Sequence, residues 1–294
     1  MPKFSTYDGT ELAYHVRGEG EPLVCLAGGP MRASAYLGDL GGLTAHRRLV
    51  LLDPRGAGES AEPADPGTYR ADRQVDDVEA LRTHLGLERL DLLGHSAGAT
   101  LAVLYAAAHP ERLTSLTLVT GGTRPAGIEA TAEDRREAAD LRKDEPWYAE
   151  SRPALDEMLA GRDIDEVWDL VLPFMYGRWD ATARAHAASD DDQTNFAAAD
   201  AFYADGALGD TAATRAALTA VTAPVLVLAG EYDAGPRPAR AAELAALFPH
   251  GRLAVQHGAG HYPWVDDPAA FARTVAAFLT PPPDFGTGAG GRTR

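Results

Sequence analysis

The pentapeptide Gly94-His-Ser-Ala-Gly98 carries the strongest chemical signal in the sequence, and we call it the elbow. It stands between an apolar run with strand composition, residues 90–93, and a helix expected to begin at Ala97. A serine on so tight a strand-to-helix turn has strained backbone angles, and flanking glycines avoid clashes there. The turn also directs the N–H of Ala97 and the helix N-terminus toward developing negative charge. The pattern predicts Ser96 as a nucleophile, whereas a mere turn would carry no chemistry.

A serine nucleophile needs a base, and the base needs a carboxylate to orient it. After an elbow of this kind the acid follows a late strand and precedes the histidine. The apolar run 225–229 leads into a loop that offers Glu231 and Asp233. We expect Asp233 to be the acid because it lies further into the loop, and Glu231 to be a solvated loop charge.

Two histidines, His257 and His261, flank Gly258-Ala-Gly260 after the last apolar run. A histidine at the strand end packs locally, whereas the glycine loop gives His261 the reach toward Ser96. The pair also forms an H-x-x-x-H pattern, but it falls on a loop without a third ligand, so a zinc site is not expected. The predicted triad is therefore completed by His261, and no metal ligands are predicted.

The loop Ala27-Gly-Gly-Pro30 follows the first long apolar run and is the candidate for a second oxyanion donor. Glycines let backbone N–H groups approach a substrate oxygen closely. We predict that Gly29 and Ala97 form the oxyanion hole, with Gly28 as the less favoured donor. A tight turn without chemistry is the alternative.

Apolar runs alternate with segments of helical periodicity along most of the chain. The expected strands cover residues 10–16, 23–27, 49–52, 90–93, 113–119, 225–229 and 253–255, with a hairpin signal at Asp8-Gly9. The expected helices cover residues 72–85, 97–109, 238–248 and 268–279. Continuous rather than alternating apolar runs suit parallel strands buried on both faces. The pattern predicts an α/β fold with a doubly wound, mostly parallel sheet.

The alternation stops between residues 123 and 220, a stretch with several helical segments and no convincing strand. We expect a core domain from residues 1–122 and 221–280, a helical cap at 123–220 and a disordered tail at 281–294. A substrate pocket between sheet and cap is predicted to use Gly28, Trp147, Trp168, Tyr176 and Trp179. Alternatively, these aromatic side chains only pack the cap helices together.

The chain has 294 residues, one cysteine and a formal net charge of −16. So acidic a chain is not expected to bind phosphate backbones or an anionic membrane surface. A single cysteine excludes an internal disulfide. The first residues show no secretory signal, and no apolar run is long enough to span a membrane, so we expect a cytoplasmic protein.

Taken in order, the elbow, the loop Asp53–Ser60, Asp233 and the Gly-Ala-Gly-His ending at His261 resemble the α/β-hydrolase superfamily over about residues 5–280. This resemblance implies an eight-stranded sheet with an inserted all-helical cap. In the loop Asp53–Ser60 itself we expect only a structural role.

Gly28-Gly-Pro30 together with Asp53-Pro-Arg-Gly56 is similar to the proline iminopeptidase branch of serine peptidases. The chain has Ala27 where that branch usually has histidine, and Ala97 where it usually has tryptophan, so the resemblance does not carry N-terminal proline specificity. In that branch acidic cap residues bind a substrate ammonium. Asp190-Asp-Asp192 could do so here, although a solvated helix end is the simpler interpretation.

The expected reaction is two-step acyl transfer on a small, largely apolar ester or lactone, without a cofactor. The alternatives are a proline iminopeptidase-like aminopeptidase, carbon–carbon bond hydrolysis or transacylation on the same triad, and a non-catalytic binding module. A small molecule is the only partner expected. The sequence leaves monomer and dimer open.

Overall fold

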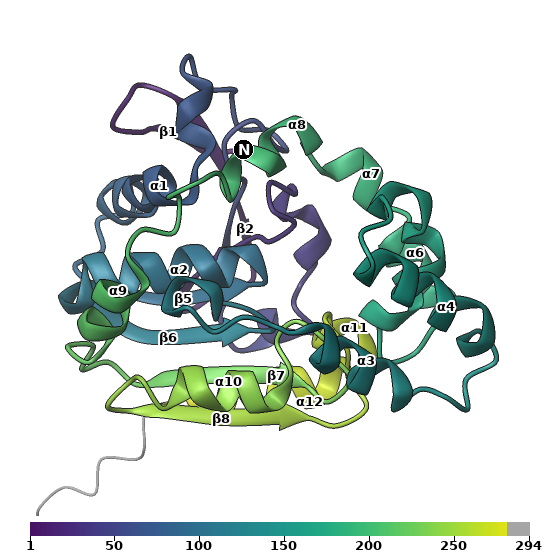
Figure 1. Cartoon of the computed structure of the whole chain (residues 1–294). Helices are drawn as coiled ribbons and strands as arrows, with labels where there is room; N and C mark the ends of the chain where they lie inside the picture. The colour runs from purple at the N-terminus through teal and green to yellow at the C-terminus, as the bar shows by residue number, and fades with distance from the viewer. Residues whose placement is uncertain (281–294) are drawn as a thin grey trace, which may run out of the picture.

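The computed structural model describes residues 1–280, so the expected disordered tail at 281–294 lies outside the described residues. Its centre is an eight-stranded sheet with the spatial order β1-β2-β4-β3-β5-β6-β7-β8 (Figure 1). The strands are β1 (Lys3–Ser5), β2 (Glu11–Arg17), β3 (Pro22–Leu26), β4 (Arg48–Leu52), β5 (Leu90–His95), β6 (Leu113–Val119), β7 (Val225–Gly230) and β8 (Gly251–Gln256). The pairs β1–β2 and β2–β4 are antiparallel and the other neighbours are parallel. The expected mostly parallel sheet is confirmed.

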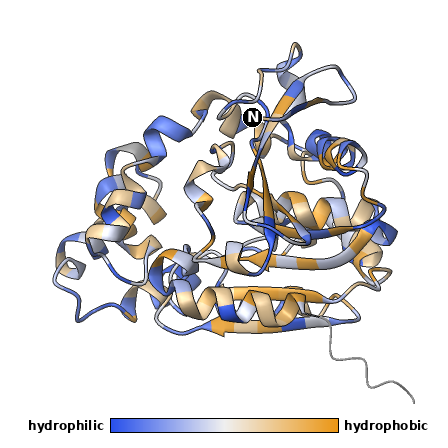
Figure 2. Ribbon diagram, turned by 180° about the vertical axis from the view of Figure 1, so that it is seen from behind, coloured by the Kyte–Doolittle hydropathy of each residue, from blue (hydrophilic) through white to orange (hydrophobic). Residues whose placement is uncertain are grey.

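Strand burial explains why the apolar runs in the sequence are continuous. Every residue of β7 is buried, because this strand lies inside the sheet and is covered on both faces. The edge strand β8 is partly exposed instead. Parallel strands between two helical layers have no solvent face, and so they do not alternate polar with apolar residues. In Figure 2 the hydrophobic colour accordingly gathers along the strands.

Helices pack on both faces of the sheet. They are α1 (Ala71–His84), α2 (Ala97–Ala108), α10 (Pro238–Ala245), α11 (Pro263–Asp266) and α12 (Pro268–Leu279). One core cluster joins the sheet to α1, α2 and α10, and a second joins its other face to α11, α12 and the 3₁₀ helix η1 (Ser34–Leu37). Residues 97–106 of α2 are all buried, which fits a helix that is apolar on every side. None of the helices within residues 1–280 is long and apolar enough to cross a membrane.

The segment between β6 and β7 is built from helices. These are α3 (Ala132–Asp140), α4 (Tyr148–Leu159), α5 (Trp168–Val171), α6 (Ala181–Ala187), α7 (Asp190–Gln193), α8 (Phe196–Phe202) and α9 (Thr211–Leu218). Figure 1 shows α4, α6 and α7 beyond the ends toward which the strand arrows point. An α/β sheet with an inserted helical cap is therefore the fold. Its exact domain boundaries stay a prediction.

Strand register determines which loops meet at the carboxyl end of the sheet. Leu26 of β3 lies opposite Gly94 of β5, so the loop after β3 runs beside the elbow. On the other side, His95 pairs with Val119 at the end of β6. The loops after β7 and β8 follow in the same direction, which places all the predicted site loops at one edge.

Candidate active site

Ser96 occupies the strained position that its flanking residues predict. Its φ is 54° and its ψ is −117°, between the last residue of β5 and the first of α2. A Cβ on Gly94 would lie 2.4 Å from the carbonyl oxygen of Gly98, and one on Gly98 would lie 2.2 Å from that of Leu26. Both positions therefore require glycine. The strain is held in place by close backbone contact on both sides of the serine.

Asp233 and His261 are brought together from the loops after β7 and β8. The Nδ1 of His261 lies 3.1 Å from Oδ2 of Asp233, and both side chains are buried. The other carboxylate oxygen of Asp233 accepts the N–H of Gly235 at 2.9 Å. The Nε2 side of the His261 ring is not used by Asp233. Within residues 1–280 the hydroxyl of Ser96 has no hydrogen-bond partner.

The backbone of His261 is fixed from the cap and from the sheet. Its N–H donates to the carbonyl of Met175 at 2.7 Å. Its carbonyl accepts from Thr120 Oγ1 at 2.8 Å and from the His95 ring at 2.9 Å. The Nε2 of His95, the residue just before Ser96, thus ties the His261 loop directly to the elbow.

The alternative acid and base form a separate pair on the surface. The ring of His257 is 86% exposed and lies 3.5 Å from Glu231, which also accepts the N–H of Gly258 at 2.8 Å. Glu231 therefore shapes the loop that leads to His261. The structure joins Asp233 to His261 and leaves Glu231 with His257.

The loop after β3 lies against the nucleophile. A Cβ on Gly28 would lie 2.8 Å from the Cβ of Ser96. The N–H of Gly28 donates to the hydroxyl of Tyr36 at 2.7 Å. Among the described residues, the N–H groups of Gly29 and Ala97 have no acceptor. Two backbone donors therefore remain unused beside Ser96.

Buried hydrogen bonds join the loop Asp53–Ser60 to neighbouring segments of the fold. One carboxylate oxygen of Asp53 accepts both the N–H and the hydroxyl of Ser34, at 2.8 and 2.6 Å. The buried guanidinium of Arg55 donates two bonds of 2.5 Å to Asp77. Burial raises the pKa of Asp77 to about 6, although Arg55 acts in the opposite direction. These contacts agree with the structural role expected for the loop.

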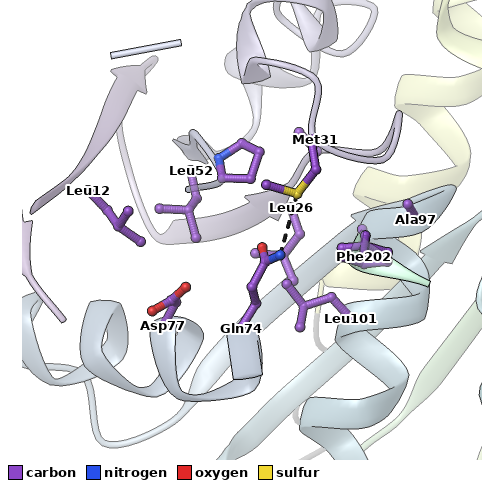
Figure 3. Close-up of a pocket in the computed structure, with 12 residues that line it drawn as sticks. Leu12, Leu26, Met31, Leu52, Gln74, Asp77, Ala97, Leu101 and Phe202 are labelled. Carbon is purple, nitrogen blue, oxygen red and sulfur yellow. Dashed lines mark hydrogen bonds between the residues drawn. The ribbon is translucent and has the colours of Figure 1, made fainter. Parts of the chain in front are cut away.

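A small apolar cavity opens beside the start of α2 (Figure 3). Its volume is about 20 Å³, and it is lined by Leu12, Leu26, Ala27, Met31, Leu52, Pro54, Gln74, Asp77, Ala97, Gly98, Leu101 and Phe202. The amide of Gln74 donates to the Met31 sulfur at 3.4 Å, as Figure 3 shows, and Phe202 contributes the cap side. A cavity of this size holds about one water molecule or a small apolar group.

The predicted substrate-binding aromatics pack against neighbouring aromatic and apolar side chains. Trp147 meets Phe174 edge-on at 4.9 Å between ring centroids, and Trp168 packs in a cluster inside the cap. Trp179 lies 5.4 Å from Tyr176. Tyr176 is 1% exposed, although it stacks at 4.9 Å on Tyr262, the residue after His261. The contacts of Trp147 and Trp168 fit the alternative of cap packing, and the binding roles of the four aromatics stay a prediction.

Three residues at this site carry no sequence signal that marks them. Tyr36 bonds the Gly28 N–H and His95, and Thr120 bonds the carbonyl of His261. Arg32 is 2% exposed and lies 3.1 Å from Asp190 of the cap. The sequence marks His95 only by its position next to Ser96. Their roles depend on contacts between distant segments.

Comparison with known proteins agrees with this architecture. A family model described as alpha/beta hydrolase fold matches residues 21–268. A proline iminopeptidase of Lactobacillus helveticus is 41% identical over 117 residues, which cover 37% of this chain and only 40% of that relative. The proline iminopeptidase structure of Mycobacterium smegmatis is 27% identical with a TM-score of 0.72, covering 95% of this chain and 97% of that one.

An enol-lactonase structure from Burkholderia xenovorans LB400 is also similar. It is 24% identical, with a TM-score of 0.68, and the match covers 95% of this chain and 99% of that one. At this identity the likeness concerns the fold. The resemblance to a superfamily with proline iminopeptidase members is confirmed, and so is the expectation of a hydrolase. The match over residues 21–268 establishes that this chain belongs to the alpha/beta hydrolase fold family.

Proposed function

We propose that this protein is a serine hydrolase that cleaves a small, largely apolar ester or lactone through an acyl-enzyme. The observation that carries the proposal is the strained elbow at Ser96, whose His95 bonds the carbonyl of a buried His261 that is itself bonded to Asp233. The unused N–H groups of Gly29 and Ala97 supply the third requirement of acyl transfer, an oxyanion hole. This set of groups is the one that a serine nucleophile needs.

In the proposed reaction the Ser96 oxygen attacks the carbonyl carbon while His261 Nε2 takes the hydroxyl proton. Asp233 holds the ring orientation and stabilises the imidazolium. The two backbone N–H groups bind the oxyanion, and each is worth about 3 kcal/mol in the transition state. His261 passes its proton to the leaving alkoxide. Water then gives a proton to His261 and attacks the acyl group, and that proton returns to Ser96.

Two features favour an ester or lactone over an N-terminal amine substrate. The cavity beside Ala97 is small and lined mainly by apolar side chains, which suits a short acyl group. Asp190, an acid of the cap, is paired with the buried Arg32 at 3.1 Å. A carboxylate already neutralised by a guanidinium is a poor receptor for a substrate ammonium. The proposed reaction does not require that Trp147, Trp168, Tyr176 or Trp179 bind the substrate.

A proline iminopeptidase-like aminopeptidase is the second candidate. It is supported by the likeness to the Mycobacterium smegmatis proline iminopeptidase, at 27% identity over nearly the whole chain. It would require Asp191 or Asp192, which Arg32 does not contact, to bind the ammonium group. A non-catalytic binding module would leave the Ser96 hydroxyl unreactive. The cytoplasmic location stays a prediction.

The test combines a fluorophosphonate probe with two substrate series. We expect the probe to label Ser96 and aryl acetates to be hydrolysed, while Ser96→Ala abolishes both. Labelling that persists in Ser96→Ala would disprove the nucleophile assignment. Turnover of proline arylamides far above that of aryl acetates would favour the aminopeptidase. No labelling and no turnover in the wild type would favour the binding module.

A further inference from the structure

Two buried side chains outside the proposed triad form a continuous hydrogen-bond chain across the site. Tyr36 lies in η1 and is 5% exposed, and His95 lies at the end of β5 and is 1% exposed. The hydroxyl of Tyr36 is 2.7 Å from the Gly28 N and 2.6 Å from His95 Nδ1. The other ring nitrogen of His95 is 2.9 Å from the carbonyl oxygen of His261. The chain thus runs from the loop after β3 to the loop of the base.

Each proton in this hydrogen-bond chain has only one possible position. The Gly28 N–H can only donate, so the Tyr36 oxygen accepts it. The Tyr36 hydroxyl then donates to Nδ1 of His95, because Gly28 offers no acceptor. His95 must carry its proton on Nε2 and donate it to the His261 carbonyl, which can only accept. Burial, together with the charge of His261, holds the pKa of His95 well below its ordinary value, which keeps this tautomer neutral.

We propose that Tyr36 and His95 are positioning residues of the reaction, which hold the oxyanion loop and the base loop in register around Ser96. This inference rests on the proposed function. Neither side chain is assigned contact with substrate. Each acts through a backbone group: Tyr36 through Gly28, and His95 through His261.

The hydrogen-bond chain also determines which glycine N–H is left to bind the oxyanion. Because the Gly28 N–H is bonded to Tyr36, it is not available to a substrate oxygen, and the next N–H along, that of Gly29, is free. Tyr36 therefore orients the Gly28–Gly29 segment while Gly28 lies against Ser96. Without the hydroxyl, the Gly28 N–H would be buried with no partner, and the loop would gain by turning this group toward water.

Tyr36→Phe removes one oxygen atom and keeps the ring, and Tyr105→Phe is its matched control. Tyr105 is buried as well, but its hydroxyl bonds Glu79 at 2.8 Å, between α1 and α2 and away from the elbow. With an aryl acetate we expect Tyr36→Phe to lower kcat by ten- to a hundredfold, with KM within threefold of the wild type. Tyr105→Phe should keep both within twofold, even if it unfolds at a lower temperature.

A merely structural role of Tyr36 would not weaken transition-state binding selectively. We therefore expect an arylboronic acid, which mimics the tetrahedral adduct, to bind Tyr36→Phe at least tenfold more weakly, in proportion to the loss in kcat/KM. For His95 the informative pair is His95→Gln and His95→Ala. Glutamine offers an amide N–H to the His261 carbonyl, so it should recover at least a third of the activity that alanine loses. If His95→Ala does not fold, Tyr36→Phe and the boronic acid still decide.

The inference and the proposed function fail in different ways. If the wild type labels at Ser96 and hydrolyses aryl acetates, but Tyr36→Phe keeps kcat and boronic acid affinity within twofold, the positioning role is wrong and the function stands. If Tyr36→Phe raises KM and leaves kcat unchanged, Tyr36 acts in substrate binding and the positioning role is again wrong. If the wild type neither labels nor hydrolyses, the proposed function itself is wrong.

Discussion

Acid should destabilise this protein through His186, a half-buried histidine of α6. Its Nδ1 accepts the Tyr176 hydroxyl at 2.9 Å, and its Nε2 donates to the carbonyl of Tyr36 at 3.2 Å. The bond to the carbonyl requires a proton on Nε2, and the bond from Tyr176 requires an unprotonated Nδ1, so the two together require the neutral ring. Burial, followed by the positive charge of Arg32, lowers the pKa of His186 from 6.5 to about 4.

The sign and size of the effect follow from that pKa. Because the folded value is below the unfolded one, the unfolded chain binds the proton more tightly between pH 4 and 6.5. The contribution of the neutral ring is therefore complete above about pH 6.5 and is lost as the pH falls from there toward 4. A drop from 6.5 to about 4 corresponds to about 3 kcal/mol at most, of which about 2 kcal/mol is lost at pH 5.

The assay is urea unfolding at pH 7 and pH 5 for the wild type and His186→Gln, which cannot titrate. Any cost of the substitution at pH 7 cancels, because only the change between the two pH values is compared. We expect the free energy of unfolding to fall by about 2 kcal/mol more in the wild type than in His186→Gln. His257→Gln, at a ring that is 86% exposed, should follow the wild type. Equal pH dependence of the wild type and His186→Gln would refute the reasoning.

Three further outcomes are expected. Arg55→Met leaves the Asp77 carboxylate buried without its partner and should lower the free energy of unfolding by about 3–5 kcal/mol in urea, whereas the double variant with Asp77→Leu should recover at least half of that. Gly98→Ala places a Cβ 2.2 Å from a backbone oxygen, so fluorophosphonate labelling should slow at least a hundredfold in chains whose circular dichroism is unchanged. Phe202→Ala enlarges the cavity and should raise kcat/KM for an aryl hexanoate relative to the acetate by about tenfold. Leu244→Ala, in the same core cluster but outside the cavity lining, should leave that ratio unchanged.

The elements that surround the elbow could be predicted because their signals are local. Gly94 is required by a contact with Gly98, four positions away, and the fully buried strand β7 is apolar throughout. Boundaries were less well predicted: the helix expected at 238–248 ends at Ala245, and the strand expected at 253–255 covers Gly251–Gln256. The expected strands also omit β1, a three-residue strand too short to show a pattern.

The groups that orient the site could not be predicted because they act across long sequence separations. Nothing in the residues around Tyr36 indicates that its hydroxyl meets His95, which is 59 positions away. Likewise, the aromatic content of the cap is compatible with a pocket and with a packed core. Trp147 and Trp168 contact other cap residues. Whether such side chains line a pocket or pack together depends on how the helices pack. Composition records which side chains are present, and only the fold decides what each of them faces.

The loop that supplies the proposed oxyanion donor is also the loop that binds the cap. The buried Arg32 donates to Gln193 at 3.1 Å and to Ser189 at 2.9 Å, and its guanidinium lies 4.4 Å from the centre of the Tyr36 ring. A backbone hydrogen bond from the Ala33 N–H to the Gln193 carbonyl joins the two segments as well. The cap is therefore in direct contact with the segment that follows the proposed oxyanion donor. For that reason we expect Gln193 and Ser189 of the cap to influence substrate specificity through the position of this loop.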